Sequence, residues 1–140
     1  PKLEDEVTIL KTHHTRKQVM PQDQIEGVLT PEDLMKFRAQ VQEILIEDKI
    51  FTYIAQIVEK TRNHPHLFLG GSPRASLAIM NASKAYAAIS GRDFVTPDDI
   101  KKTLAPVLSH RIILSPEREM EGMTPETVIE MITQSVEIPR

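Results

Sequence analysis

The stretch GGSPRAS, residues 70–76, places an arginine at the start of an apolar helix, where helix electrostatics disfavour a cation. Ser72 is expected at the N-cap, Pro73 at the first helical position and Arg74 at the second. A cation there meets the positive end of the helix dipole, which costs about 0.3–1 kcal/mol at an exposed site. The same place suits an anion such as phosphate, because free backbone N–H groups lie beside a guanidinium fork.

Arg74 has two explanations from spacing alone. It binds an anion together with the free backbone N–H groups of the helix start, or it pairs with an acidic side chain of a neighbouring helix. The residues themselves leave both open.

The other residues capable of chemistry have plainer explanations. The histidines lack the i, i+4 helical pairing and the cysteines of a metal site, so we expect no metal and place them in loops and on the surface; they are His13, His14, His64, His66 and His110. Charges that suit the helix dipole are expected near helix ends; they are Arg62, Asp98, Asp99, His110 and Arg111. Arg92 and Asp93 are expected to form a turn that fixes the next helix. No nucleophile, base and orienting group occur at recognisable spacing.

Length and composition limit the possible classes of protein. The chain has 140 residues, no Cys, no Trp, four Phe and two Tyr, so one domain with an aliphatic core is expected. A net charge of −3 gives no electrostatic reason to expect nucleic acid or an anionic membrane. Apolar windows are too short for membrane insertion, and the first residues do not resemble a signal peptide. Absence of cysteine favours a cytoplasmic location, and a start at Pro1 predicts a piece of a longer protein.

Helix starts are predicted by five Ser/Thr–Pro pairs, in the segments LTPED, GSPRA, VTPDD, LSPER and MTPET. The side chain before each proline caps the helix, and proline at the first helical position loses no needed hydrogen bond. Thr30 with Asp33, and Thr96 with Asp99, come close to a capping box. LSPER is the weakest of the five, because little periodicity follows it.

Apolar residues at helical spacing predict an all-α fold, a small bundle of about six helices. The sets are Leu3, Val7 and Leu10; Leu34, Phe37, Val41, Ile44 and Leu45; Ile50, Phe51, Ile54, Ile57 and Val58; Ile100, Leu104, Val107 and Leu108; and Val128, Ile129, Ile132 and Val136. The helix after Ser72 is expected to be central, because apolar residues cover most of it. RIILS is a possible short strand, although no second strand is evident. We expect one domain over residues 1–140, with a helix at 1–13, a polar connector at 14–29 and the main bundle at 30–140.

Residues 70–112, GGSPRASLAIMNASKAYAAISGRDFVTPDDIKKTLAPVLSHRI, resemble the C-terminal lid of the MoxR family of AAA+ ATPases. In that family a G-A-S-P-R-A segment carries the arginine called sensor 2, which reaches the γ-phosphate of ATP bound in the core domain. Arg74 matches that arginine, and Gly71 stands where the family commonly has Ala. The segments YIAQIVEKTR, PKLEDEVTIL and VLTPEDL also look like family segments. The resemblance covers most of the chain.

The resemblance implies a function for Arg74 in a larger protein. Arg74 would act as sensor 2, with Ser72 and Pro73 facing the nucleotide, while an N-terminal ATPase core binds ATP and Mg²⁺. This sequence has no G-x-x-x-x-G-K-[ST] loop and no apolar strand ending in paired acidic residues, so we expect it neither to bind nor to hydrolyse ATP by itself. The family also implies a homo-oligomer, a hexamer, and chaperone-like maturation of partner proteins; no client is indicated.

A binding module is the alternative from a different class. The stretch AAISGRDFVTPDDIKKTL resembles the later part of histone-fold proteins, in which a long helix and a Thr-capped helix pair with a partner. The negative net charge counts against DNA binding. This alternative leaves GGSPRAS unexplained.

Overall fold

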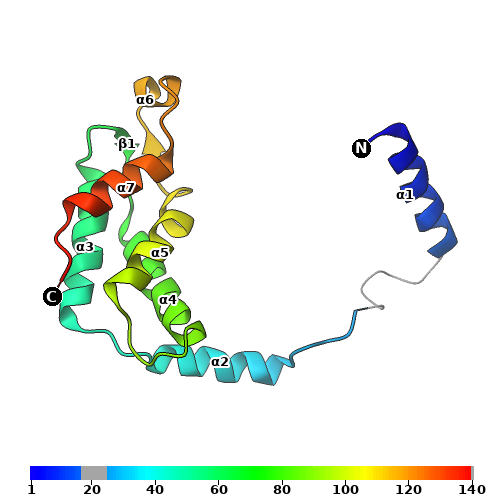
Figure 1. Ribbon diagram of the computed structural model, residues 1–140, viewed down its shortest axis with the longest axis horizontal. Coiled ribbons are helices and arrows are strands. Elements are labelled where there is room, and N and C mark those ends of the chain that lie inside the picture. Colours follow the sequence, from blue (N-terminus) through cyan, green and yellow to red (C-terminus); the bar gives the residue numbers. More distant parts are fainter. Residues whose placement is uncertain (17–24, 140) are drawn as a thin grey trace. The chain divides into compact units, whose positions relative to one another are not determined.

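The computed structural model describes residues 1–16 and 25–139, and the chain forms two compact units, Pro1–Met35 and Lys36–Arg140. Its elements are α1 (Leu3–Arg16), α2 (Pro31–Glu43), α3 (Asp48–Arg62), β1 (Leu67–Leu69), α4 (Pro73–Ile89), α5 (Pro97–Leu108), β2 (Ile113–Leu114), α6 (Pro116–Met120) and α7 (Pro125–Ser135), as Figure 1 shows. The predicted helical fold is confirmed. One domain over 1–140 stays a prediction, and residues 17–24 of the predicted connector lie outside the described residues.

Helix α1 belongs to the first unit and buries none of its side chains there. The helix predicted for residues 1–13 is present and continues to Arg16. None of the described helices combines the length and apolar composition needed to cross a membrane.

Four helices of the second unit enclose its core. Helix α4 packs against α3 and α5, and α7 packs against the same two helices, so the four form a closed arrangement (Figure 1). The helical spacings predicted for α3, α5 and α7 are confirmed, because their apolar sets are buried apart from Phe51 of α3, which is 44% exposed. Most of the fully buried side chains are aliphatic, and Tyr53 is the exception among the large apolar ones. The aliphatic side chains include Ile50, Ile57, Ile79, Ile100, Leu104, Leu108, Val128 and Ile132.

Helix α4 differs from the broad apolar helix that the sequence predicts. It does lie between α3 and α5, but its buried residues are Ala75, Ile79, Ser83 and Ala87, mostly small ones spaced by four. Small residues let neighbouring helices approach closely. Larger apolar side chains of α4 are exposed instead, with Leu77 at 57% and Ile89 at 87%. The prediction of a broad buried face is therefore wrong: α4 buries a narrow stripe, and its larger apolar side chains lie outside this core.

A two-stranded sheet corrects the expectation that RIILS has no partner. β2 pairs with β1 in antiparallel fashion, Leu67 opposite Leu114 and Leu69 opposite Ile113. The partner was missed because β1 has three residues and an irregular register, too short for a period of two to appear. The pairing ties the chain before α4 to the chain after α5.

Caps form at three of the five predicted helix starts. Asp33 N–H donates to the Thr30 hydroxyl at 3.1 Å, Thr127 N–H to the Thr124 hydroxyl at 3.3 Å, and Thr96 N–H to Asp99 Oδ2 at 2.8 Å. The other two starts, at Ser72 and Ser115, have the backbone geometry of an N-cap but no side-chain cap hydrogen bond. The capping prediction is therefore wrong for both serines.

The turn before α5 is fixed by an ion pair between Arg92 and Asp99, whereas the sequence predicted a turn made by Arg92 and Asp93 and did not predict this ion pair. Both terminal nitrogens of Arg92 donate to Asp99, at 2.7 and 2.6 Å, and Arg92 also donates to the Phe94 carbonyl at 3.1 Å. The Asp99 side chain is 2% exposed. Burial raises the pKa of the Asp99 carboxyl, but hydrogen bonds from Arg92 and Thr96 outweigh burial and hold that pKa below its ordinary value.

We expect Asp99→Asn to lower the free energy of unfolding by about 2 kcal/mol at neutral pH, because it removes charge-assisted hydrogen bonds in a buried place. Since the folded pKa lies below the unfolded one, the contribution of Asp99 is complete above the pKa of a free Asp, about 3.9, and is lost as pH falls through the folded value. Urea unfolding of the chain across this pH range measures it.

Asp98→Asn is the matched control, because the neighbouring Asp98 side chain is 78% exposed and pairs loosely with Lys101. We expect it to change the free energy of unfolding by less than about 0.5 kcal/mol. Equal losses in the two variants would contradict the role given to Asp99.

Candidate functional site

Arg74 lies in the first turn of α4 with its side chain exposed to solvent. Its guanidinium has no ion pair or hydrogen bond with any described residue. The alternative that Arg74 pairs with an acidic side chain of a neighbouring helix is thus not found in the part of the chain that the structure describes. A free guanidinium at this place is available to an anion from outside the chain.

Charge at the start of α4 is unlike charge at the other helix starts. Every other described helix carries an acidic residue in its first turn, and α4 carries none. Acidic residues at that place are favourable to the helix dipole, so α4 lacks a common stabilising interaction. Its N-terminus therefore has an uncompensated positive field with Arg74 inside it.

Polar groups at this helix start are also free. The Ser72 hydroxyl makes no cap hydrogen bond, and no described acceptor receives the N–H of Arg74. Pro73 between them contributes no donor. Ser72 and Pro73 are both exposed. The structure thus brings the three predicted site residues together on one exposed turn, with hydrogen-bonding capacity left over.

The loop before this turn is pressed against the end of α3. A Cβ atom built on Gly70 would lie 2.5 Å from Arg62 Cα and 2.5 Å from the Thr61 carbonyl oxygen, which no side chain can occupy. At Gly71 the nearest atom would be Ala75 Cβ at 3.3 Å, a tight but adjustable contact. Gly70 is therefore required by close approach of two backbones, and the family's Ala at position 71 fits this geometry with a small shift.

Two side chains of α3 hold the same loop. The Thr61 hydroxyl accepts the N–H of Gly71 at 2.8 Å, and Arg62 Nε donates to the Gly71 carbonyl at 2.8 Å. The sequence explained Arg62 by the helix dipole alone, and that explanation is incomplete, because Arg62 also holds the loop through Gly71. The signal that could have revealed this contact is the glycine pair itself, because adjacent glycines after a helix often mark a close backbone approach.

The remaining candidate residues are spread over the chain. His64 and His66 lie ring edge to ring face, with centroids 5.0 Å apart, and burial and then His66 lower the pKa of His64. Within residues 1–16 and 25–139, no three His, Asp or Glu side chains are arranged to hold a metal ion. Arg111 donates to the Val107 carbonyl, which agrees with the predicted capping of that helix end.

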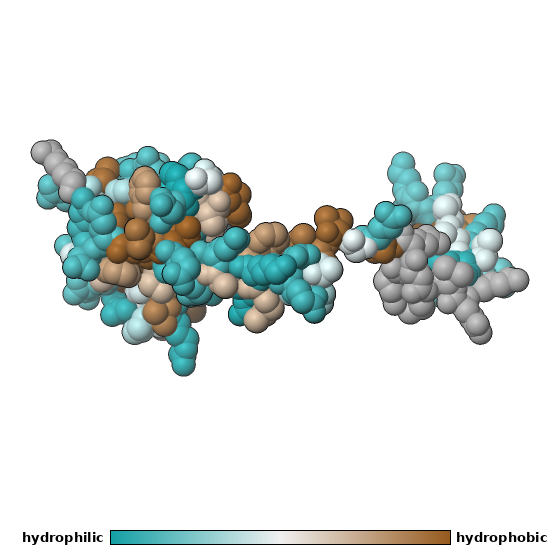
Figure 2. Space-filling view, turned by 90° about the horizontal axis from the view of Figure 1, so that it is seen from below, coloured by the Kyte–Doolittle hydropathy of each residue, from teal (hydrophilic) through white to brown (hydrophobic). Residues whose placement is uncertain are grey.

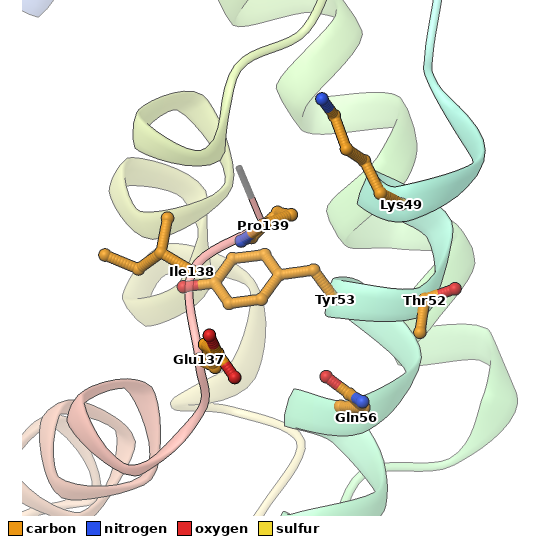
Figure 3. Close-up of a pocket in the computed structure, with 7 residues that line it drawn as sticks. All are labelled: Lys49, Thr52, Tyr53, Gln56, Glu137, Ile138 and Pro139. Carbon is orange, nitrogen blue, oxygen red and sulfur yellow. The ribbon is translucent and has the colours of Figure 1, made fainter.

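A separate hollow of about 350 Å³ lies between the first half of α3 and the segment after α7 (Figure 3). Tyr53 reaches across it to Ile138 and Pro139, and its hydroxyl is buried with no hydrogen-bond partner among the described residues. Burial, and then the charge of Asp98, raise the pKa of Tyr53. The hollow lies toward the opposite end of α3 from Thr61 and Arg62, so it is not part of the Arg74 site.

Apolar side chains are also exposed on the second unit. Figure 2 shows apolar patches between hydrophilic side chains on one face of this body. The most exposed large apolar side chains of the unit include Leu45, Phe68, Ile89 and Met120. Patches of this kind are common where a domain meets a neighbour.

Comparisons with known proteins agree with the fold. The family model of the AAA lid domain matches residues 59–132 of this chain. The protein YeaC of Bacillus subtilis is 37% identical over 139 residues, 99% of this chain and 42% of that protein. Chaperone MoxR1 of Mycobacterium tuberculosis is 29% identical over 126 residues, 84% of this chain and 33% of that protein.

A crystal structure of a proposed ATPase from Cytophaga hutchinsonii has a TM-score of 0.78 and 27% identity, and it covers 99% of this chain and 44% of that one. The chain therefore spans less than half the length of each of these three proteins. The matched residues include the whole of α4 and the turn that carries Arg74.

We expect Gly70→Ala to lower the free energy of unfolding by about 2 kcal/mol, because the new methyl group would force the loop away from α3. Gly71→Ala is the matched comparison. It should be close to neutral, since the tight contact is offset by about 0.4–1 kcal/mol from lower entropy of the unfolded chain. Thermal and urea unfolding of both variants measure the difference. A larger loss at Gly71 than at Gly70 would show that the loop is packed differently.

Proposed function

The chain belongs to the AAA lid domain family, and from this premise we propose that it closes over ATP bound by an ATPase core of the same protein. Arg74 reaches the γ-phosphate in this proposal. Its guanidinium supplies two parallel donors and a fixed charge, the geometry that suits a phosphate group. The resemblance to the lid of MoxR-type ATPases, whose sensor 2 arginine Arg74 matches, supports this role.

The observation that carries the proposal is the free guanidinium of Arg74 at the one described helix start without an acidic residue. Charge placed against the dipole costs stability, so its presence calls for a compensating role. A phosphate that arrives from outside the chain removes that cost, because it meets the guanidinium, the Arg74 N–H and the positive end of α4 together.

In this proposal, residues of this chain contact the γ-phosphate, and residues of the ATPase core bind the metal ion. Ser72, Pro73 and Arg74 face the γ-phosphate, and the Ser72 hydroxyl offers one more hydrogen bond. Mg²⁺, when bound, neutralises charge on the phosphates, and residues of the core would hold it. The residues of this chain orient the phosphate and stabilise negative charge that develops during hydrolysis.

Hydrolysis would be coupled to movement of the lid. When the γ-phosphate leaves, Arg74 loses its partner and the closed position loses stabilisation, so the angle between lid and core relaxes. The lid, as part of a homo-oligomer such as a hexamer, would transmit this movement to partner proteins in chaperone-like maturation. The similarity to chaperone MoxR1 supports this assignment of class.

We expect Arg74→Ala to lower ATP turnover of the full-length protein by about a hundredfold, the size of effect seen when one preorganised charge stabiliser is removed. Arg74→Lys should recover only part of the activity, because lysine keeps the charge and lacks the planar fork. Steady-state phosphate release measures turnover, and gel filtration shows whether the protein still assembles.

Arg38→Ala is the control for loss of a surface arginine. Arg38 lies exposed on α2, and the structure gives it no ion pair with a described residue. We expect its turnover to stay within about twofold of the unmodified protein. Unchanged turnover in an assembled Arg74→Ala protein would show that Arg74 is not a γ-phosphate sensor, and the binding-module alternative would then regain ground.

A further inference from the structure

We propose that Thr61 and Arg62, in the last turn of α3, are positioning residues for Arg74. This inference rests on the proposed function, because it concerns how Arg74 is held in place to meet phosphate. The contacts of both residues lie on the loop that leads into α4, and neither residue needs to touch nucleotide itself.

Thr61 fixes the first half of the loop. Its side chain is buried, with 1% of the residue exposed, and its hydroxyl donates to the Val58 carbonyl at 2.6 Å while it accepts the N–H of Gly71 at 2.8 Å. The two hydrogen bonds determine the direction of the hydroxyl hydrogen. The peptide plane between Gly70 and Gly71 is therefore anchored to α3 at a defined angle.

Arg62 fixes the second half of the loop. Its Nε donates to the Gly71 carbonyl at 2.8 Å, which belongs to the peptide plane between Gly71 and the N-cap Ser72. Consecutive residues of one helical turn thus hold consecutive peptide planes of the loop. Charge-assisted hydrogen bonds of this kind are stronger than neutral ones.

The start of α4 depends on these contacts because its own cap is missing. Helix starts such as those at Thr96 and Thr124 are closed by hydrogen bonds of their own side chains, whereas Ser72 makes none. The position of Ser72 is instead inherited from Gly71, and Pro73 carries it into the helix with a fixed φ. Thr61 and Arg62 therefore determine the position of the first turn of α4, which carries Arg74.

A small displacement of Arg74 has a large consequence for a phosphate contact. A guanidinium stabilises developing charge when its donors already point at the phosphate oxygens, and a misplacement of about 1 Å can lower a rate by up to about a hundredfold. Close packing of Gly70 on α3 prevents the loop from compensating. Loss of either contact with Gly71, from Thr61 or from Arg62, should therefore displace Arg74 and reduce ATP turnover.

The test is a double-mutant cycle in the full-length protein with ATP as the probe. Thr61→Val keeps the shape of the side chain and removes the hydroxyl, and we expect it to lower kcat about tenfold. In the Arg74→Ala background the same substitution should change kcat less than twofold, because the residue that it positions is already gone. Thr61→Ser restores the hydroxyl and should restore kcat.

Two further variants keep the test informative if Thr61→Val does not fold. Arg62→Ala changes an exposed side chain and should also lower kcat about tenfold, again only when Arg74 is present. Lys60→Ala is its matched control. Lys60 belongs to the same turn and also donates to a backbone carbonyl, but that carbonyl is Ser135 at the end of α7. Its kcat should stay within twofold.

The outcomes separate this inference from the proposed function. If Arg74→Ala leaves turnover unchanged, the proposed function fails and this inference fails with it. If Arg74→Ala lowers turnover while the Thr61 and Arg62 variants act by the same factor in both backgrounds, or not at all, only this inference is overturned. If Thr61 and Arg62 had only a structural role, their substitution would lower kcat by the same factor with and without Arg74. It would also lower the thermal stability in both backgrounds.

Discussion

The second unit depends on closing a mainly aliphatic core between four helices, with Tyr53 as its buried aromatic side chain and no disulfides. Helices α3 and α5 supply most of that core, and α4 and α7 each cover both of them. Because α4 turns small residues inward, its backbone comes close to its neighbours. The buried hydrogen bond of 2.9 Å between Ser83 and Thr103 holds α4 to α5 in one register. This placement of α4 fixes where its first turn, with Arg74, lies relative to α3 and α5.

The sequence was sufficient where physical rules act over a short range. Ser/Thr–Pro pairs located the helix starts, and the spacing of apolar residues identified the buried sides of α3, α5 and α7. A turn at Arg92 was also predicted, but its ion pair with Asp99, seven residues on, was not. Local signals of this kind need no knowledge of the neighbouring elements.

Sequence reasoning was insufficient where the partner lies elsewhere in the chain. The β1–β2 pair joins segments about forty-five residues apart, and neither strand is long enough to show alternation. Small residues on α4 appeared as one broad apolar face, because periodicity does not say which side a neighbour approaches. The missing cap at Ser72 was invisible for the same reason: the loop is held by Thr61 and Arg62 of another helix.

The free arginine and the rigid loop that precedes it have a joint consequence for how a lid would work. A side chain on a mobile loop could follow a phosphate without moving its domain, and hydrolysis would then do little to the domain as a whole. Arg74 instead lies in the first turn of a helix packed against α3 and α5, and the loop before it is hydrogen-bonded to the end of α3. A pull on the guanidinium would therefore act on the whole helical body, because close-packed cores transmit displacement instead of absorbing it. In the proposed function, contact with the γ-phosphate and closure of the lid are in this way one event.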